Sequence, residues 1–190
     1  MHPPAAGRRM SCAILGAAVL AGALLLADTA RAASAADLDR KSDTALQQLL
    51  GSNDQAHALA DEARAILVFP SIVKGGFIFG GQFGDGALRE GGRTTGYHRS
   101  VAVSYGLQAG VQAFGYALFF MNDDALDYFR KSHGFEVGVG PSIVVLDKGA
   151  ASALTTTTGR SDVYAVFFDE KGLMAGLGLQ GTKITQIHPK

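Results

Sequence analysis

The chain has 190 residues, of which 47% are hydrophobic, and its 17 lysines and arginines balance 17 aspartates and glutamates. This composition excludes a disordered chain, and a net charge of zero argues against broad nucleic-acid binding, which leaves a basic footprint. A single cysteine excludes an intramolecular disulfide framework, and 25 glycines are the compositional anomaly that the fold has to explain.

The N-terminal segment has the features of an export signal. Arg8 and Arg9 precede an uncharged apolar run over 13–27, which is followed by the small-x-small sequence Ala30-Arg31-Ala32. The run is shorter than the roughly 20 residues of a membrane-spanning helix. We therefore predict a cleaved signal peptide over 1–32, a single domain over 33–190, and a location in the periplasm or at the outer membrane.

Two short helices are predicted next. Ser34-x-x-Asp37 and Ser52-x-x-Gln55 each resemble a capping box. The first helix would end at Gly51 and the second before Pro70, although residues 66–69 suit a strand as well as a helical turn.

After Pro70 the hydrophobic period changes from about 3.6 to 2, which indicates β-strands. Large residues alternate with small residues or glycine around 77–79, 101–112, 135–140 and 173–180, and one helix capped by Asn122 interrupts them. Glycines repeated within strands imply strong bending or close approach of another element. The predicted fold is α+β, with N-terminal helices packed on a glycine-rich, strongly curved, largely antiparallel β-sheet or small barrel.

Several sequence blocks resemble, in order, the motifs of one known family. These blocks are AILVFP at 65–70, KGGF at 74–77, the glycines of 80–86, SYG at 104–106, GVGP at 138–141 and GLMAG at 172–176. They are similar to the SYLF domain, also called the Ysc84 family, and the resemblance spans about residues 37–187.

The resemblance implies a non-enzymatic lipid-binding module without a cofactor or a metal. Eukaryotic members are associated with phosphoinositide membranes, and some yeast members with actin filaments. An actin role is not expected here, because this chain carries an export signal and lacks an attached SH3 or FYVE domain. The expected partner is an anionic phospholipid headgroup at a membrane of the bacterial envelope.

Basic residues supply candidate lipid contacts. On the first helix, Arg40 and Lys41 are offset by three aspartates, so this helix either covers the β core or lies on a membrane. Lys74 precedes Gly75 and Gly76, whose N–H groups could approach a phosphate while the lysine supplies charge. The alternative is a solvated lysine beside a β-bulge.

Three arginines are a second candidate group. Arg89, Arg93 and Arg99 lie around a glycine-rich stretch from Gly84 to Gly96, which we interpret as a loop with a basic rim for a headgroup. Ordinary loop charges are the alternative.

Two further functions are weighed against lipid binding. A self-assembling envelope protein would use an exposed strand edge at Thr155–Thr158. A hydrolase would need a pocket in which His98 or His133 meets a carboxylate and a hydroxyl. The dinucleotide-like glycines at 176, 178 and 181 have no βαβ unit around them, and Asp123 and Asp127 are explained by their helix, so no enzyme is expected.

Overall fold

The computed structural model describes residues 34–76, 79–105, 110–132, 135–136, 139–146, 161–172 and 181–190. Its elements in chain order are α2 (Ala35–Ser52), α3 (Asp54–Glu62), β1 (Ala65–Gly76), β2 (Phe79–Glu90), β3 (Arg93–Tyr105), β4 (Gly110–Phe120), α4 (Asp123–Lys131), β5 (Phe135–Glu136), β6 (Ile143–Leu146), β7 (Val163–Gly172) and β8 (Lys183–Ile187).

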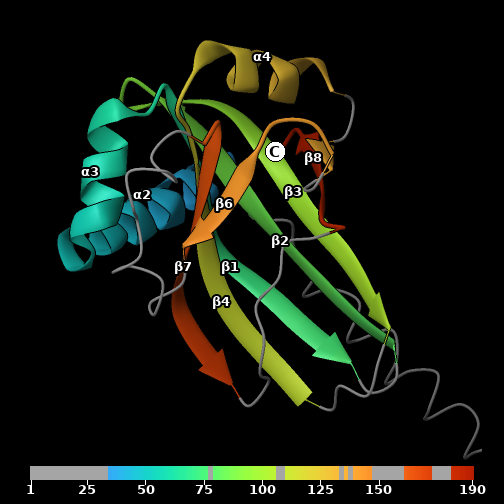
Figure 1. The fold of residues 1–190 in the computed structure, drawn as a ribbon. Helices are drawn as coiled ribbons and strands as arrows, with labels where there is room; N and C mark the ends of the chain where they lie inside the picture. Colours follow the sequence, from blue (N-terminus) through green and yellow to red (C-terminus); the bar gives the residue numbers. More distant parts are fainter. Residues whose placement is uncertain are drawn as a thin grey trace, which may run out of the picture. The chain divides into compact units, whose positions relative to one another are not determined.

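The eight strands form one strongly curled sheet in the order β5-β8-β3-β2-β1-β4-β7-β6 (Figure 1). All neighbouring strands are antiparallel except β6 and β7, which are parallel. In the described part, the sheet ends at two short strands, β5 and β6. The predicted α+β fold, with N-terminal helices packed on a curved and largely antiparallel sheet, is confirmed.

The helix caps agree with the sequence at one site and differ at the other. Ser34 accepts a hydrogen bond from the backbone N–H of Asp37 at 3.2 Å, as predicted. The cap of α3 is Asn53, not Ser52, because the Asn53 side chain accepts from the N–H groups of Gln55 and Ala56, both at 3.0 Å. The Ser52 hydroxyl instead donates to the carbonyl of Gln48 within α2.

Pro70 does not end a helix, because it lies within β1. Helix α3 ends at Glu62, and residues 66–69 take the strand alternative. The register of β1 shifts between Val68 and Val73 against β2, and between Phe69 and Ile72 against β4. This irregularity accommodates a proline, which has no N–H for the ladder, in a central strand.

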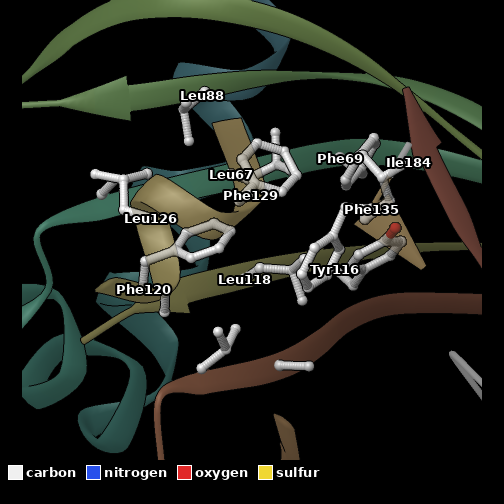
Figure 2. Close-up of a cluster of buried hydrophobic side chains, with 14 of the residues drawn as sticks. Leu67, Phe69, Leu88, Tyr116, Leu118, Phe120, Leu126, Phe129, Phe135 and Ile184 are labelled. Carbon is white, nitrogen blue, oxygen red and sulfur yellow. The ribbon is translucent and has the colours of Figure 1, made fainter. Parts of the chain in front are cut away.

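Helices cover both faces of the sheet. On one side, which we call the α4 face, Leu67 and Tyr116 belong to a core with Leu126 and Phe129 of α4 (Figure 2). On the opposite side, the α2 face, Val68 packs in a second core with residues of α2 and α3. Because successive strand residues point to opposite faces, strand position determines which core a side chain enters.

Helix α2 is attached to the sheet by its acidic residues as well as by its leucines. Leu38 and Leu49 are buried. Asp39 accepts hydrogen bonds from Thr94 at 2.8 Å and from the Tyr97 phenol at 3.0 Å. Asp43 pairs with Arg89 of β2 in the same interface. The first of the two readings of this helix therefore holds, since its apolar face covers the β core.

Candidate functional site

The basic residues of α2 lie on its exposed side. The Arg40 guanidinium bonds to Asp37 at 2.5 Å, three residues earlier, and Lys41 is exposed. This pair lowers the pKa of Asp37. No helix in the described part of the chain has the length and apolar character needed to cross a bilayer.

The predicted basic rim is not formed as the sequence suggested. Residues 84–96 are not a loop but parts of β2 and β3, joined by a tight turn at Gly91 and Gly92, both of which have positive φ. Arg89 is held by Asp43, and Arg93 is exposed beside the turn. The charges are therefore spread along a hairpin.

Arg99, the third arginine of the predicted rim, is bound by a carboxylate on the neighbouring strand. Its Nε and Nη2 atoms donate to Asp85 at 2.6 and 2.8 Å. This bidentate pair raises the pKa of Arg99. Much of its charge is thus compensated within the sheet.

Lys74 lies in a polar row on the α4 face. It is half-buried and stands opposite Gln82 of β2 and Gln112 of β4. Gln82 donates to Thr182 at 3.3 Å, whereas the Oε1 atom of the buried Gln112 has no hydrogen-bond partner among the described residues. The row is therefore a polar environment at one end of the apolar core on this face.

Gly75 and Gly76 follow Lys74 within the strand, not in a turn. Both pair with β2 on one side and with β4 on the other. A central strand directs its N–H groups into its ladders. Their pairing gives these two glycines a structural role in the sheet, and lipid contact by this segment stays a prediction.

The α2 face carries an exposed apolar surface that the sequence did not predict. It consists of Val73, Phe83, Val101, Val103 and Val111, which we call the valine patch. Phe83 is 60% exposed and Val103 is 82% exposed. The patch lies toward the C-terminal ends of β1 and β3 and the N-terminal ends of β2 and β4. These four strands extend beyond the helices (Figure 1).

Strand register makes the valine patch continuous. Val73 stands opposite Phe83, and Phe83 stands opposite Val101, so these three side chains form one row across β1, β2 and β3. In the next row, Val103 and Val111 stand on either side of Gly81 and Gly75, which pair with each other. Directly opposed residues share a face of the sheet, so both rows form one surface.

Lysines lie at both ends of the first row. Val101 stands opposite Lys183 of β8, and Ala113, the neighbour of Val73, stands opposite Lys171 of β7. Both lysines are exposed. Glu136 neighbours Lys183, and the compensated Asp85–Arg99 pair separates the patch from α2. The surface is thus apolar at its centre and ionic at its margins.

The patch was missed because hydrophobic alternation does not say which face is buried. The alternation over 101–112 indicates a large-residue face and a small-residue face, but not which of the two is buried. In β3 the inward side is His98 and Ser100, both buried, and Ser100 accepts a 2.8 Å hydrogen bond from the Tyr116 phenol. Nothing in the spacing of the valines distinguishes this arrangement from the usual one.

Some residues considered above for catalysis have local structural contacts, and others lie outside the residues that the structure describes. His98 packs against Phe129, with ring centroids 4.8 Å apart, and lies in a cleft whose described lining residues include no carboxylate. Asp123 and Asp127 approach Arg64 and Lys131 at 3.7 and 3.2 Å. His133, Thr155–Thr158, Gly176 and Gly178 lie outside the described residues.

The fold and the patch define a small α+β domain whose curled sheet presents an apolar surface beside its covering helices. Residues 101–188 match the family model Ysc84, described as "Las17-binding protein actin regulator". The match over residues 101–188 confirms the resemblance seen in the sequence to the Ysc84 (SYLF) family, which is a family of binding domains. The motifs at 65–86 precede the matched residues. No curated protein matches the chain.

Proposed function

We propose that this protein is a non-enzymatic domain that binds an anionic phospholipid membrane through the valine patch and is exported to the bacterial envelope. One observation carries the proposal: five large apolar side chains lie exposed and contiguous on the α2 face. Soluble monomers seldom expose contiguous apolar surface without a partner for it.

A bilayer surface suits the distribution of charge around the patch. Aliphatic side chains and Phe83 would enter the boundary between headgroups and acyl chains, while Lys171 and Lys183 would stay at headgroup level. Each such lysine contributes about 1 kcal/mol toward an anionic leaflet. Lipid binding by eukaryotic members of the family supports the same class of partner.

Lys74 provides a second and separable contact. It lies on the α4 face, whereas the valine patch lies on the α2 face. A flat bilayer that rests on the patch therefore contacts the opposite side of the sheet from Lys74. Headgroup binding at Lys74, Gly75 and Gly76 thus requires an individual lipid to reach the polar row beside Gln112.

Vesicle co-sedimentation tests the proposal. Purified protein is mixed at low salt with vesicles of phosphatidylglycerol and phosphatidylcholine, or of phosphatidylcholine alone. We expect binding to the anionic vesicles, weakened roughly tenfold or more by a Phe83→Ser/Val103→Ser pair. Wild-type protein that stays in the supernatant would refute the proposal.

Val101 and Val145 provide a matched comparison. They are 40% and 41% exposed, but Val145 lies on β6, outside the patch. Val101→Asp should weaken binding, whereas Val145→Asp should not. Lys74→Ala then tests the headgroup prediction, since it removes charge from the other face without altering the patch.

Self-association is the competing use of the same surface. Sedimentation velocity without lipid distinguishes the two, because an interface between copies would give a dimer that Phe83→Ser/Val103→Ser converts to a monomer. That result, combined with vesicle binding unaffected by the pair, would replace the membrane proposal with an assembly role.

The export proposal is tested separately. Cell fractionation should place the protein in the periplasm or with the outer membrane. N-terminal sequencing of the purified protein should begin at Ala33, after removal of residues 1–32. Full-length protein in the cytosol would overturn this part while leaving the lipid proposal open to its own test.

A further inference from the structure

A cleft of about 420 Å³ on the α4 face has no role in the membrane proposal. It lies between β3, β8 and the C-terminal end of α4, and its lining includes Thr95, Gly96, His98, Arg130 and Gln186. The valine patch is on the opposite face of the sheet, so the two sites are independent.

His98 lies in the lining of this cleft and carries a buried polar atom without a partner in the described part of the chain. Its side chain is only 8% exposed, and its Nδ1 atom has no hydrogen-bond partner among the described residues. Burial lowers the pKa of His98 to about 4, so the imidazole is neutral near pH 7 and has one donor and one acceptor nitrogen. Buried polar atoms are normally satisfied, so an orphaned one at a cleft wall needs a partner.

The charges around the cleft are internally compensated. Arg130 donates to Glu90 at 2.5 Å, and the Thr95 hydroxyl donates to the same carboxylate oxygen at 2.5 Å. Arg130, the cationic side chain among the described lining residues, is therefore already paired. A neutral ligand suits this wall better than an anion or a cation, either of which would have to compete with the Arg130–Glu90 pair.

Gly96 leaves the space beside the imidazole. It stands opposite Leu88 in the β2–β3 ladder. Its φ is not positive, so its backbone conformation does not require glycine. A Cβ atom at position 96 would lie 3.2 Å from Cε1 of His98, which is tighter than ordinary packing. A side chain at position 96 would therefore fill the space beside the imidazole without straining the backbone.

The rest of the lining is apolar on one side and polar on the other. Leu88, Phe129 and Ile184 contribute side chains of the buried core (Figure 2). Gln186 stands opposite His98 in the β3–β8 ladder and adds an amide with both donors and an acceptor. Pockets of this kind use an apolar wall for contact area and a few polar groups for orientation.

We infer that this cleft binds a small uncharged molecule that carries hydroxyl groups, such as a monosaccharide or a polyol, with one hydroxyl bonded to the imidazole of His98. A hydroxyl both donates and accepts, so it satisfies either tautomer of the neutral imidazole. Further hydroxyls would bond to Gln186, and the carbon-bound hydrogens of the ligand would contact the apolar wall.

Side-chain ¹⁵N NMR of His98 in the full-length protein tests this inference. The neutral probes are D-glucose, N-acetylglucosamine and myo-inositol, and the anionic probes are inorganic phosphate and acetate. We expect at least one neutral probe to shift the His98 ring nitrogens saturably, in the millimolar range. The absence of a saturable shift with all three neutral probes, or tighter binding of an anionic probe, would overturn the inference.

Variants show whether the change in the His98 ¹⁵N shifts arises from binding in the cleft. Gly96→Val should weaken binding at least tenfold because it fills the space beside His98. Gln186→Ala, on an exposed position, should weaken binding at least threefold even where Gly96→Val does not fold. Gly51→Ala in α2, where an added Cβ meets no atom within 4 Å, should bind as the wild type does. Wild-type affinity in Gln186→Ala and in a folded Gly96→Val would place the probe elsewhere and overturn the inference.

Discussion

The ring of Phe69 on β1 lies against Gly86 on β2, where a Cβ atom would come within 2.6 Å of the ring carbon Cδ1. The carbonyl oxygen of Val68 would lie 2.5 Å from the same Cβ atom. Glycine at position 86 therefore allows β1 and β2 to approach at the point where the register of β1 shifts.

We predict that Gly86→Ala destabilises the protein by about 1–3 kcal/mol, the usual range for overpacking. Both atoms that the new methyl group would meet belong to the core or the backbone, so neither can move freely. Gly81→Ala on the same strand is the control, because its nearest contact would be an ordinary 3.8 Å. Urea denaturation measures the free energy of unfolding of both variants. Equal decreases in the two variants would contradict the packing explanation.

The carboxylates of α2 should contribute unequally to stability. Asp43→Asn leaves Arg89, whose side chain is only 15% exposed, without its ionic partner, whereas Asp37→Asn removes an exposed pair within the helix. We expect a loss of roughly 1–3 kcal/mol for Asp43→Asn and a clearly smaller loss for Asp37→Asn, because solvent screens an exposed pair. Thermal unfolding of the two variants gives the comparison, and a larger loss for Asp37→Asn would contradict the docking role of Asp43.

Stability should fall on mild acidification because of His98. Its pKa is about 4 in the folded protein and about 6.5 when unfolded, so the unfolded chain binds more protons between these values. The stabilisation is fully present above pH 6.5 and is lost as the pH falls toward 4, by about 3 kcal/mol in total. Arg130 lines the cleft that contains His98, and the Glu90 carboxylate is bonded to it.

A His98→Gln variant isolates this effect. The lowered pKa values of Asp37, Glu90 and Asp162 make their own contributions fall only at more acidic pH, near and below the usual carboxyl values. Between pH 6.5 and 5, the free energy of unfolding should therefore decline in the wild type and stay nearly level in the variant. Parallel curves over this interval would show that His98 titrates normally.

Two pairs of basic residues distinguish the surface found in the structure from the one suggested by the sequence. Lys171→Gln/Lys183→Gln removes the lysines at the ends of the patch, and Arg40→Gln/Lys41→Gln removes the exposed charges of α2. We expect the first pair to weaken binding to anionic vesicles and to reduce its salt dependence, because exposed charges are screened over about 10 Å at 0.1 M salt.

The second pair should bind nearly as the wild type does, since Arg40 is already paired with Asp37. The measurement is co-sedimentation between about 20 and about 300 mM salt. The Debye screening length falls severalfold over this range. A larger loss of vesicle binding for the Arg40→Gln/Lys41→Gln pair would indicate that α2, not the valine patch, contacts the membrane.

Local sequence features determined much of the fold. The Ser34 cap, the leucine spacing of α2 and the period-2 segments predicted helices followed by a curved sheet, because these features depend on neighbours three or four residues away or on simple alternation. The glycine excess also indicated close approach, as found at Gly84, Gly86 and Gly115. The ordered sequence motifs gave the resemblance to the Ysc84 (SYLF) family, which the match over residues 101–188 confirms.

Tertiary structure alone decided which surfaces are available. Alternation showed that Val101 and Val103 share a face, but only the position of α2 shows that this face is uncovered at Val103 and covered at Tyr97. The sequence does not show that Arg89 and Arg99 are paired, because their partners Asp43 and Asp85 lie on another element. Exposure and charge compensation depend on which distant strands and helices meet, and the local spacing of residues does not encode that.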